Sequence, residues 1–364
     1  MKRSGFADRV VAWQKVHGRR DLPWQSRRDP YRVWLSEIML QQTQVATVVP
    51  YYERFLERFP DVASLAHAPL DEVMRLWSGL GYYSRARNLH AAARAVDAQG
   101  GRFPRSRTRL EALPGVGRST AAAIAALAWG AREAILDGNV KRLLARHFAV
   151  PGHPGDAKVE RRLWDLAESL LPERDNACYT QALMDLGATV CRPRRPECAR
   201  CPVAQTCAAR RENAIERFPA PRPRKAVPVK RTGMLLLVHR GQVLLEKRPA
   251  SGIWGGLWCL PQIPAGEDPV GHCVTRFGAS IASVRTMPQL THGFTHFTLR
   301  IRPVVCEVGA LEPRAEQPGR TWLAPAEAAG AAVPAPVRRL LLDAPLALSR
   351  PSARGRAARG SAAG

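Results

Sequence analysis

The chain has 364 residues and a formal net charge of +24 at neutral pH, and 46% of its residues are hydrophobic. This length exceeds what one ordinary core holds and predicts two or three domains, while the composition excludes a largely disordered chain. No apolar run reaches the ~20 residues that a membrane-spanning helix needs, and the N-terminus lacks the apolar stretch of an export signal. We therefore expect a cytoplasmic protein with no membrane partner, whose basic charge favours a partner that carries phosphate.

The N-terminal part of the chain predicts a series of helices. The first is expected over residues 6–16, and Pro30 then opens a second helix expected over 31–45. Glu37 lies in this second helix at the edge of an apolar stripe. Desolvation at such a position raises the pKa of a carboxyl group, which suits a general acid. The alternative is a boundary glutamate whose side chain reaches water.

Two exposed polar segments of this region are candidates for contact with a nucleic acid. Gln42 belongs to the polar run 41–44, and Tyr82 follows a predicted turn at Gly79 and Gly81. Amide groups can bind base edges, and an aromatic ring on a turn among arginines can stack on a base. Ordinary surface glutamines and a packed tyrosine are the alternatives.

The run LPGVG at 113–117 lies between a short helical segment ending at Ala112 and an alanine-rich helix expected to start near Ser119. Its glycines allow a tight turn whose backbone amides point outward at a helix N-terminus, where anions bind. We expect this hairpin to contact DNA phosphate through five residues, Leu113, Gly115, Gly117, Arg118 and Ser119. Such hairpins also occur in ligases and nucleases, so the motif alone indicates no particular reaction.

Four of the eight cysteines form a compact group, C-x6-C-x2-C-x5-C, made by Cys191, Cys198, Cys201 and Cys207. In a cytoplasmic protein such a group indicates a metal site rather than a disulfide framework. Zinc sites usually pair their cysteines as two short units, and this run has only one, so the spacing favours one [4Fe-4S] cluster over zinc. The cluster is expected to be structural. The other four cysteines are expected to be buried thiols.

After Cys207 the composition changes. Prolines and basic residues predict an extended linker over 210–231. The runs 233–240 and 242–249 flank Gly241 and predict a β-hairpin, and a further strand within 294–308 and a helix near 336–342 complete an α+β pattern. The expected organisation is an all-helical domain over 1–209, the linker over 210–231, a second domain over 232–346 and a disordered basic tail over 347–364.

Taken together, these motifs resemble the MutY family of adenine DNA glycosylases, a branch of the helix-hairpin-helix iron–sulfur glycosylase superfamily. The runs that carry the resemblance are 36–45, 79–90, 113–121, 136–142 and 248–262, together with the cysteine spacing. The resemblance extends from about Phe6 to Leu342. It implies an all-α helix-hairpin-helix region with a [4Fe-4S] loop, followed by an α+β domain similar to a Nudix hydrolase.

The same resemblance implies an activity. The family excises adenine mispaired with 8-oxoguanine or guanine in double-stranded DNA, after flipping the adenine out of the stack. Glu37 corresponds to its catalytic acid, Asp137 to the carboxylate that stabilises the cationic sugar, and Asn139 to a residue that orients the pair. Gln42 and Tyr82 correspond to residues that insert into the duplex. By itself, Asp137 would be read as a helix N-cap.

Position 119 bears on the reaction type. Endonuclease III-type relatives carry a lysine there, which forms a Schiff base and cuts the strand, whereas the hydroxyl of Ser119 cannot form an imine. We therefore expect a monofunctional glycosylase without efficient strand cleavage. A thymine or uracil glycosylase of the same superfamily and a non-catalytic DNA-binding protein are the alternatives.

The resemblance also implies that the second domain recognises 8-oxoguanine. The family uses a Phe-Ser-His loop, and this chain has Phe294, Thr295 and His296. Threonine keeps the hydroxyl and adds a methyl group, and an ordinary strand is the alternative interpretation. Residues 265–280 lack the glutamate-rich run of an active Nudix hydrolase, so nucleotide hydrolysis is not expected. We further expect a monomer, associated with the bacterial nucleoid.

Overall fold

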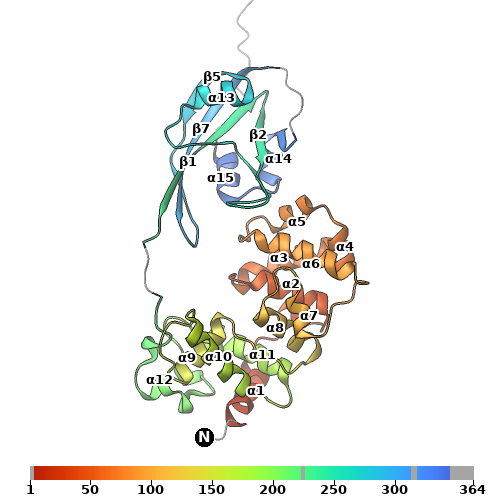
Figure 1. Ribbon diagram of the computed structural model, residues 1–364, viewed down its shortest axis with the longest axis vertical. Helices are drawn as coiled ribbons and strands as arrows, with labels where there is room; N and C mark the ends of the chain where they lie inside the picture. The colour runs from red at the N-terminus through yellow and green to blue at the C-terminus, as the bar shows by residue number, and fades with distance from the viewer. Residues whose placement is uncertain (1–3, 223–225, 313–317, 345–364) are drawn as a thin grey trace, which may run out of the picture. The chain divides into compact units, whose positions relative to one another are not determined.

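The computed structural model describes residues 4–222, 226–312 and 318–344 and divides into two compact units, Met1–Lys225 and Ala226–Gly364 (Figure 1). The first unit is helical, and the second is a mixed β-sheet with helices. This confirms the predicted fold class. The tail predicted over 347–364 lies outside the described residues. Within the described ranges, no helix combines the length and apolar character needed to cross a membrane.

The first unit is built almost entirely of α-helices. These are α1 (Ser4–His17), α2 (Pro30–Leu40), α3 (Val45–Arg58), α4 (Val62–His67), α5 (Leu70–Trp77), α6 (Ser84–Asp97), α7 (Arg107–Glu111), α8 (Arg118–Trp129), α9 (Gly138–His147), α10 (Ala157–Ser169), α11 (Asn176–Asp185) and α12 (Ala208–Arg211). Short 3-10 segments lie at Pro23–Gln25, Cys198–Arg200, Ala204–Thr206 and Ile215–Arg217, and a π-helical turn at Leu186–Val190.

Aspartate side chains start several of these helices. Asp29 accepts a hydrogen bond from the backbone amide of Arg32 at the start of α2, and Pro30 occupies the first helical position. Asp61 and Ser64 form a capping box at α4. Asp137 is the N-cap of α9, and its side chain accepts a hydrogen bond from the backbone amide of Val140. Local sequence signals therefore fix where the helices around the site begin.

Two groups of buried side chains hold the helical unit together. Around α2 to α6 the core is aromatic, with Trp34, Tyr52, Phe55, Phe59 and Trp77 all fully buried. A second core joins α1 to α8, α9, α10 and α11. Helix α8 is rich in alanine, which lets α2, α7 and α11 pack closely against it. The α7–α8 hairpin is thus held between the aromatic core around α2 to α6 and the second core around α1 and α9 to α11.

The helix predicted over 31–45 is confirmed as far as Leu40 and is wrong beyond it. Helix α2 ends at Leu40, Gln42 has a left-handed backbone with φ of 56°, and α3 begins at Val45. The reason lies in a long-range contact, because the guanidinium of Arg85 donates to the carbonyls of Met39 and Gln41. These terminal carbonyls are therefore satisfied without continuing the helix.

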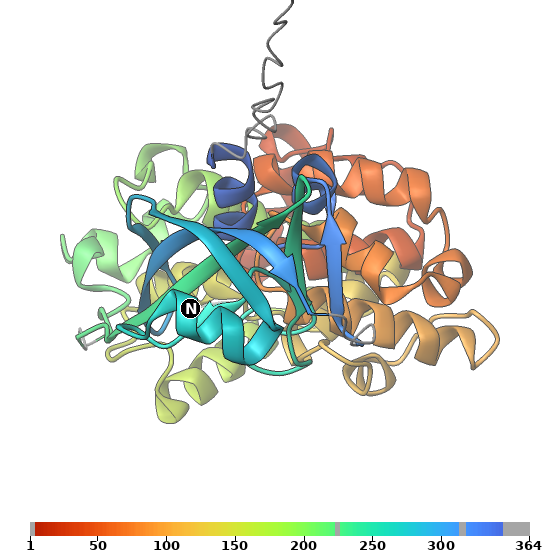
Figure 2. The same ribbon diagram turned by 90° about the horizontal axis from the view of Figure 1, so that it is seen from above.

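The second unit contains one mixed sheet. Its strands are β1 (Val229–His239), β2 (Gln242–Lys247), β3 (Trp258–Cys259), β4 (Gln262–Ile263), β5 (Ala279–Thr286), β6 (Leu290–Gly293), β7 (Thr298–Leu311) and β8 (Arg320–Leu323). The main strand order is β3-β2-β1-β7-β5. Helix α13 (Pro269–Phe277) packs on one face, and α14 (Pro325–Gly330) and α15 (Ala335–Asp343) cover the other (Figure 2).

The predicted hairpin around Gly241 is confirmed, with β1 and β2 antiparallel and Val238 opposite Val243. The long parallel pairing of β1 with β7 was not predicted, because strands so far apart in sequence leave no local signal. The segment predicted as a linker over 210–231 carries regular structure at both ends. The end of α12 and the turn at Ile215–Arg217 occupy its start, and β1 begins at Val229.

Candidate functional site

The hairpin between α7 and α8 presents its backbone to solvent. Gly115 has φ of 77°, and a Cβ added there would lie 2.8 Å from the Cβ of Asn88 on α6. Glycine is therefore required at this turn. Gly115 and Gly117 are exposed, and Gly117 is the N-cap of α8. Leu113 is buried, so its side chain holds the turn against the core rather than facing solvent.

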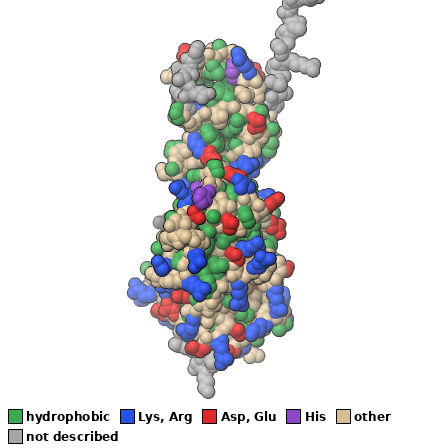
Figure 3. Space-filling model, turned by 90° about the vertical axis from the view of Figure 1, so that its right-hand side faces the viewer, with side chains coloured by type: hydrophobic (Ala, Val, Ile, Leu, Met, Phe, Trp, Pro, Cys, Tyr) green, Lys and Arg blue, Asp and Glu red, His purple; other side chains and the backbone are tan. Residues whose placement is uncertain are grey.

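The side chain of Arg118 is already engaged within the protein. Its guanidinium pairs with Glu168 and lies 3.8 Å from the ring centre of Trp164. The sequence prediction did not include these partners, which come from α10. The groups that the hairpin offers an anion are thus chiefly its backbone amides. Figure 3 shows many further Lys and Arg side chains on the helical unit, interspersed with Asp and Glu.

Ser119 and Asp137 are brought together through the residue before the aspartate. The Ser119 hydroxyl accepts a hydrogen bond from the backbone amide of Leu136 at 2.9 Å. Asp137 Oδ1 in turn accepts from the amide of Val140 at 2.8 Å. The start of α8 and the start of α9 therefore share one small hydrogen-bonded corner.

Asn139 and Arg142 support Asp137 from the same helix. Asn139 Nδ2 lies 3.5 Å from Asp137 Oδ2, and Arg142 donates to Asn139 Oδ1 at 2.8 Å. Arg142 also donates to the carbonyls of Gly187 and Cys191, at 2.6 Å and 2.8 Å. This chain of contacts joins Asp137 to the π-helical turn and to the first cysteine of the group.

Glu37 and Asp137 are electrostatically coupled. The pKa of Glu37 is raised to about 8, first by burial and then by the negative charge of Asp137. Burial also raises the pKa of Asp137, but the amide of Val140, Asn139 and Arg142 oppose this. Because Asp137 has these compensating donors, it ionises first, and Glu37 facing that charge retains its proton near neutral pH.

A cavity of about 480 Å³ lies beside α2, and Ser36, the residue that precedes Glu37 in the chain, is one of its lining residues. Val33 and Ser36 line it from α2, with the ring of Trp24 and the amide side chains of Gln25 and Gln181. None of these residues is among those predicted from the sequence. No local signal marks them, because they come from segments that only the fold brings together.

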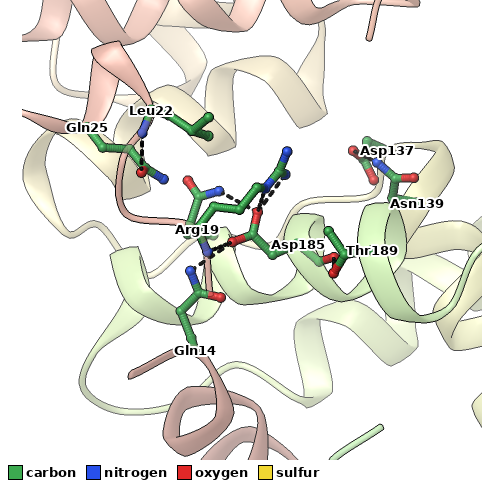
Figure 4. A network of polar contacts seen from close by, with 9 residues as sticks. Gln14, Arg19, Leu22, Gln25, Asp137, Asn139, Asp185 and Thr189 are labelled. Carbon is green, nitrogen blue, oxygen red and sulfur yellow. Dashed lines mark hydrogen bonds and ion pairs between the residues drawn. The ribbon is translucent and has the colours of Figure 1, made fainter. Parts of the chain in front are cut away.

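Asp185 anchors the basic segment that lines this cavity (Figure 4). The carboxylate is fully buried and accepts two hydrogen bonds from the Arg19 guanidinium, at 2.6 Å and 2.9 Å. Gln14 and Gln181 donate to it as well. The loop after α1 is thus fixed against α11.

Gln42 and Tyr82 lie together at a second cavity of about 230 Å³, which Gly115 of the hairpin also lines. Both side chains are exposed, and both residues have left-handed backbones, with φ of 56° and 48°. The structure therefore brings three of the residues predicted to contact DNA to one place. Tyr82 is exposed, whereas its neighbour Tyr83 is partly buried.

The four cysteines of the spaced group line a common cavity with Arg146 and His147. Arg146 is buried and its guanidinium lies 3.4 Å from Cys191 Sγ, a favourable position next to anionic sulfur. In the part of the chain that the structure describes, no three His, Cys, Asp or Glu side chains converge on a single metal ion. Four sulfurs around a shared space fit a [4Fe-4S] cluster better than one zinc, whose Zn–S bonds are about 2.3 Å.

Of the cysteines outside this group, Cys259, Cys273 and Cys306 are buried as expected. Cys178 is only partly buried, contrary to the prediction, because it lies at the edge of the cavity beside α2.

Phe294 to Phe297 form the tip of the β6–β7 hairpin, so the interpretation as an ordinary strand is wrong here. The amide of Phe294 donates to the carbonyl of Phe297 at 2.8 Å, and the two rings stack with centres 4.4 Å apart. Thr295 and His296 are exposed between them. The stacked phenylalanines thus present these two side chains at the end of a closed turn.

Comparison with known proteins gives the same two-part organisation. Residues 35–169 match the HhH-GPD superfamily of base excision DNA repair proteins, and residues 233–343 match the NUDIX domain. The adenine DNA glycosylase of Buchnera aphidicola is 38% identical over 301 residues, covering 82% of this chain and 86% of that protein. The adenine DNA glycosylase of Homo sapiens is 33% identical, covering 93% of this chain and 73% of that protein.

Among solved structures, a thermostable thymine-DNA glycosylase superposes with a TM-score of 0.52 at 32% identity, covering 58% of this chain and 97% of its own. Its likeness extends over little more than half of the chain, whereas the adenine DNA glycosylases match most of it. On this evidence of sequence and fold, the chain belongs to the adenine DNA glycosylases, hydrolases of base excision repair.

Proposed function

We propose that this enzyme excises adenine paired with 8-oxoguanine or guanine in double-stranded DNA, and that it leaves the DNA strand intact. The observation that carries the proposal is the coupled pair of carboxyl groups, in which Glu37 has a pKa of about 8 next to Asp137. One neutral and one ionised carboxyl group is the division of labour that hydrolysis of a glycosidic bond requires.

In this mechanism Glu37 gives its proton to N7 of adenine, which makes the base a leaving group. The negative charge of Asp137 then stabilises the cationic sugar, as a fixed charge or by transient covalent attachment. Asn139 and the amide of Val140 hold the Asp137 carboxylate in place. Water completes the hydrolysis and leaves an abasic site.

The cavity beside α2 supports the extrusion of the target base. Its volume of about 480 Å³ is sufficient for a purine, and it is lined by Trp24 and by the amides of Gln25 and Gln181. Aromatic and amide groups are the partners that a flipped base requires. Val33 and Ser36 place the cavity on the helix that carries Glu37.

Binding of the duplex would use the hairpin amides for phosphate and the pair Gln42 and Tyr82 for insertion into the base stack. Their common position with Gly115 at one cavity supports this assignment. The net charge of +24 favours binding to any duplex, with affinity that falls as salt rises.

The absence of strand cleavage follows from Ser119, whose hydroxyl cannot form an imine and already accepts from Leu136. Lys141, the nearest lysine in sequence, is paired with Glu160 at 2.5 Å. Its amine is thus already engaged by a carboxylate.

The cysteine group would hold one [4Fe-4S] cluster, bound through Cys191, Cys198, Cys201 and Cys207. When bound, the cluster would fix the loop that carries the cysteines and add no step to the hydrolysis. Four arginines of this loop are candidates for contact with phosphate, the exposed Arg194 and Arg195 first, and then Arg192 and Arg200. Of these, Arg192 and Arg200 share Glu197 as a partner.

Recognition of 8-oxoguanine is assigned to Phe294, Thr295 and His296. Support comes from the exposure of Thr295 and His296 at the closed tip of the β6–β7 hairpin. The threonine hydroxyl can hydrogen-bond to the damaged base, while the stacked Phe294 and Phe297 keep the turn rigid.

A thymine glycosylase is the second candidate, because the thymine-DNA glycosylase structure is 32% identical over its matched part. The test is a panel of duplexes with A opposite 8-oxoguanine, A opposite G, T opposite G and U opposite G. Release of adenine alone, measured as free base, is the expected result. Release of thymine or uracil with no adenine would contradict the proposal.

A further inference from the structure

Arg85, in the first turn of α6, contacts two separate turns of the chain. Its side chain is 7% exposed, and its guanidinium donates to six acceptors. Arginine is mostly exposed in folded proteins and is almost never fully buried unless it is paired, so this degree of burial requires a structural or functional reason.

The first turn follows α2. Nη1 of Arg85 donates to the carbonyls of Ile38, Met39 and Gln41, at 3.1 Å, 2.7 Å and 2.6 Å. Nη2 donates to the hydroxyl of Thr43 at 3.0 Å. These acceptors lie on both sides of Gln42, so the guanidinium determines the path of the backbone that carries this residue.

The second turn precedes α6. Nη2 of Arg85 also donates to the carbonyls of Leu80 and Gly81, at 3.3 Å and 3.2 Å. The indole of Trp77 donates to the same Gly81 carbonyl at 3.1 Å. Tyr82 follows directly, and its ring centre lies 5.4 Å from the guanidinium carbon. The guanidinium of Arg85 thus contacts the backbone next to Gln42 and the backbone next to Tyr82.

Gln42 and Tyr82 both adopt the left-handed backbone that residues with a Cβ rarely adopt. A conformation of this kind costs free energy and persists only where surrounding contacts enforce it. The hydrogen bonds of Arg85 to the neighbouring carbonyls can hold the left-handed backbone at both Gln42 and Tyr82.

All six acceptors are neutral, and Nε of Arg85 has no hydrogen-bond partner among the described residues. Burial without a carboxylate lowers the pKa of Arg85 to about 10. Buried charges are usually paired with an opposite charge, and this guanidinium has only neutral acceptors among the described residues. The planar guanidinium of Arg85 has several N–H donors in a fixed geometry, which lets it bind both turns at once. The single ammonium group of a lysine could not do this.

We infer that Arg85 is a positioning residue that fixes the Gln42 turn and the Tyr82 turn relative to each other, so that both side chains enter the duplex as one unit. This inference rests on the proposed function, in which Gln42 and Tyr82 insert beside the mispair. Arg85 itself would touch no base.

The test is a comparison of Arg85→Lys with the wild type in binding and in chemistry. The probe is a duplex with 2′-fluoro-2′-deoxyadenosine opposite 8-oxoguanine, in which the fluorine slows loss of the base, together with a fully paired duplex. We expect Arg85→Lys to bind the mispair duplex about tenfold more weakly. Affinity for the paired duplex should change less than about twofold, and so should the excision rate constant at saturating enzyme, measured on the unfluorinated duplex with A opposite 8-oxoguanine.

A double-mutant cycle distinguishes positioning from a general loss of stability. If Arg85 acts through the two turns, Arg85→Lys should add almost nothing to the affinity already lost in a Gln42→Ala, Tyr82→Ala protein. The inference would be overturned if Arg85→Lys weakened binding by the same factor in the Gln42→Ala, Tyr82→Ala protein as in the wild type. It would also be overturned if Arg85→Lys weakened binding to the paired duplex as much as binding to the mispair duplex. Arg94→Lys, an exposed position on the same helix, is the matched control and should bind like the wild type.

Thr43→Val provides a second variant if Arg85→Lys fails to fold, since it removes one acceptor of the guanidinium and keeps the side-chain shape. It should weaken mispair binding in the same direction by a smaller factor, and unchanged affinity would count against the inference. A wild-type protein that releases no adenine would instead contradict the proposed function. If the wild type releases adenine normally and Arg85→Lys binds the mispair duplex as tightly as Arg94→Lys does, the role of Arg85 is overturned and the proposed function stands.

Discussion

The hydroxyl of Ser119 accepts a hydrogen bond from the backbone amide of Leu136, with a distance of 2.9 Å between oxygen and nitrogen. Because Leu136 precedes Asp137, this bond connects the first turn of α8 to the carboxylate at the start of α9. Position 119 therefore lies close to Asp137, the carboxylate that the proposed mechanism places beside the sugar. This relationship makes the side chain at 119 a direct test of the reaction type.

Replacing Ser119 with lysine should introduce strand cleavage. An amine at this position can attack C1′ of the sugar and form a Schiff base, which the hydroxyl cannot do. The measurement is trapping of the protein on a duplex with A opposite 8-oxoguanine by borohydride, followed by denaturing electrophoresis. Ser119→Ala is the control: it loses the contact with Leu136 but should form no trapped complex. A Ser119→Lys protein that releases adenine without trapping would contradict the assignment.

Excision should depend on pH through Glu37. The acid must carry its proton, and its pKa is raised to about 8, so kcat/KM should fall about tenfold per pH unit above that value. Below pH 8 the proton is present, and the rate should be level until Asp137 begins to protonate. The check is a kcat/KM profile on the duplex with A opposite 8-oxoguanine. A plateau that continues through pH 10 would remove Glu37 from the acid role.

Much of this architecture is predictable from sequence because its signals are local. The Asp29-Pro30 start of α2, the LPGVG turn and the β1–β2 hairpin each depend on residues a few positions apart. Membership of the adenine DNA glycosylases and the helical-then-Nudix-like order were likewise predicted from motifs and are confirmed.

What was missed depends on distant contacts. The end of α2 at Leu40 is set by Arg85, which lies 45 residues further along the chain. The helix propensities of residues 41–45 do not predict this end. Arg118 meets Glu168 and Trp164 only in the folded protein, so sequence could not show that its charge is satisfied. The same holds for the Arg19–Asp185 pair that fixes the wall of the cavity beside α2.

Removing one cysteine of the group should remove the cluster. Cys198→Ser is expected to lose its iron and its absorbance near about 400 nm, because a hydroxyl is a poor ligand for iron–sulfur clusters. Duplex affinity should fall with it, since the basic loop is no longer fixed. Cys259→Ala, a buried cysteine of the second unit, is the control and should retain full iron content. Stoichiometric zinc and no iron in the wild-type protein would refute the cluster.

Thr295 should affect the choice of the opposite base more than the chemistry. Thr295→Ala removes the hydroxyl at the exposed turn, and we expect the preference for 8-oxoguanine over guanine opposite adenine to fall about fivefold. The measurement is the ratio of excision rates on the two mispairs at subsaturating enzyme. Thr291→Ala, an exposed threonine on β6 of the same hairpin, should leave that ratio unchanged. Equal effects of the two variants would remove Thr295 from lesion recognition.

The most direct measurement for the central claim is adenine release by Glu37→Gln, compared with wild type under single-turnover conditions on a duplex with A opposite 8-oxoguanine. Glutamine keeps the size of the side chain but cannot give up a proton, so release should fall by about 10² to 10⁴ while duplex affinity stays within a few fold. Wild type should yield strand breaks only after alkali. A Glu37→Gln protein that still releases adenine at the wild-type rate would contradict the account.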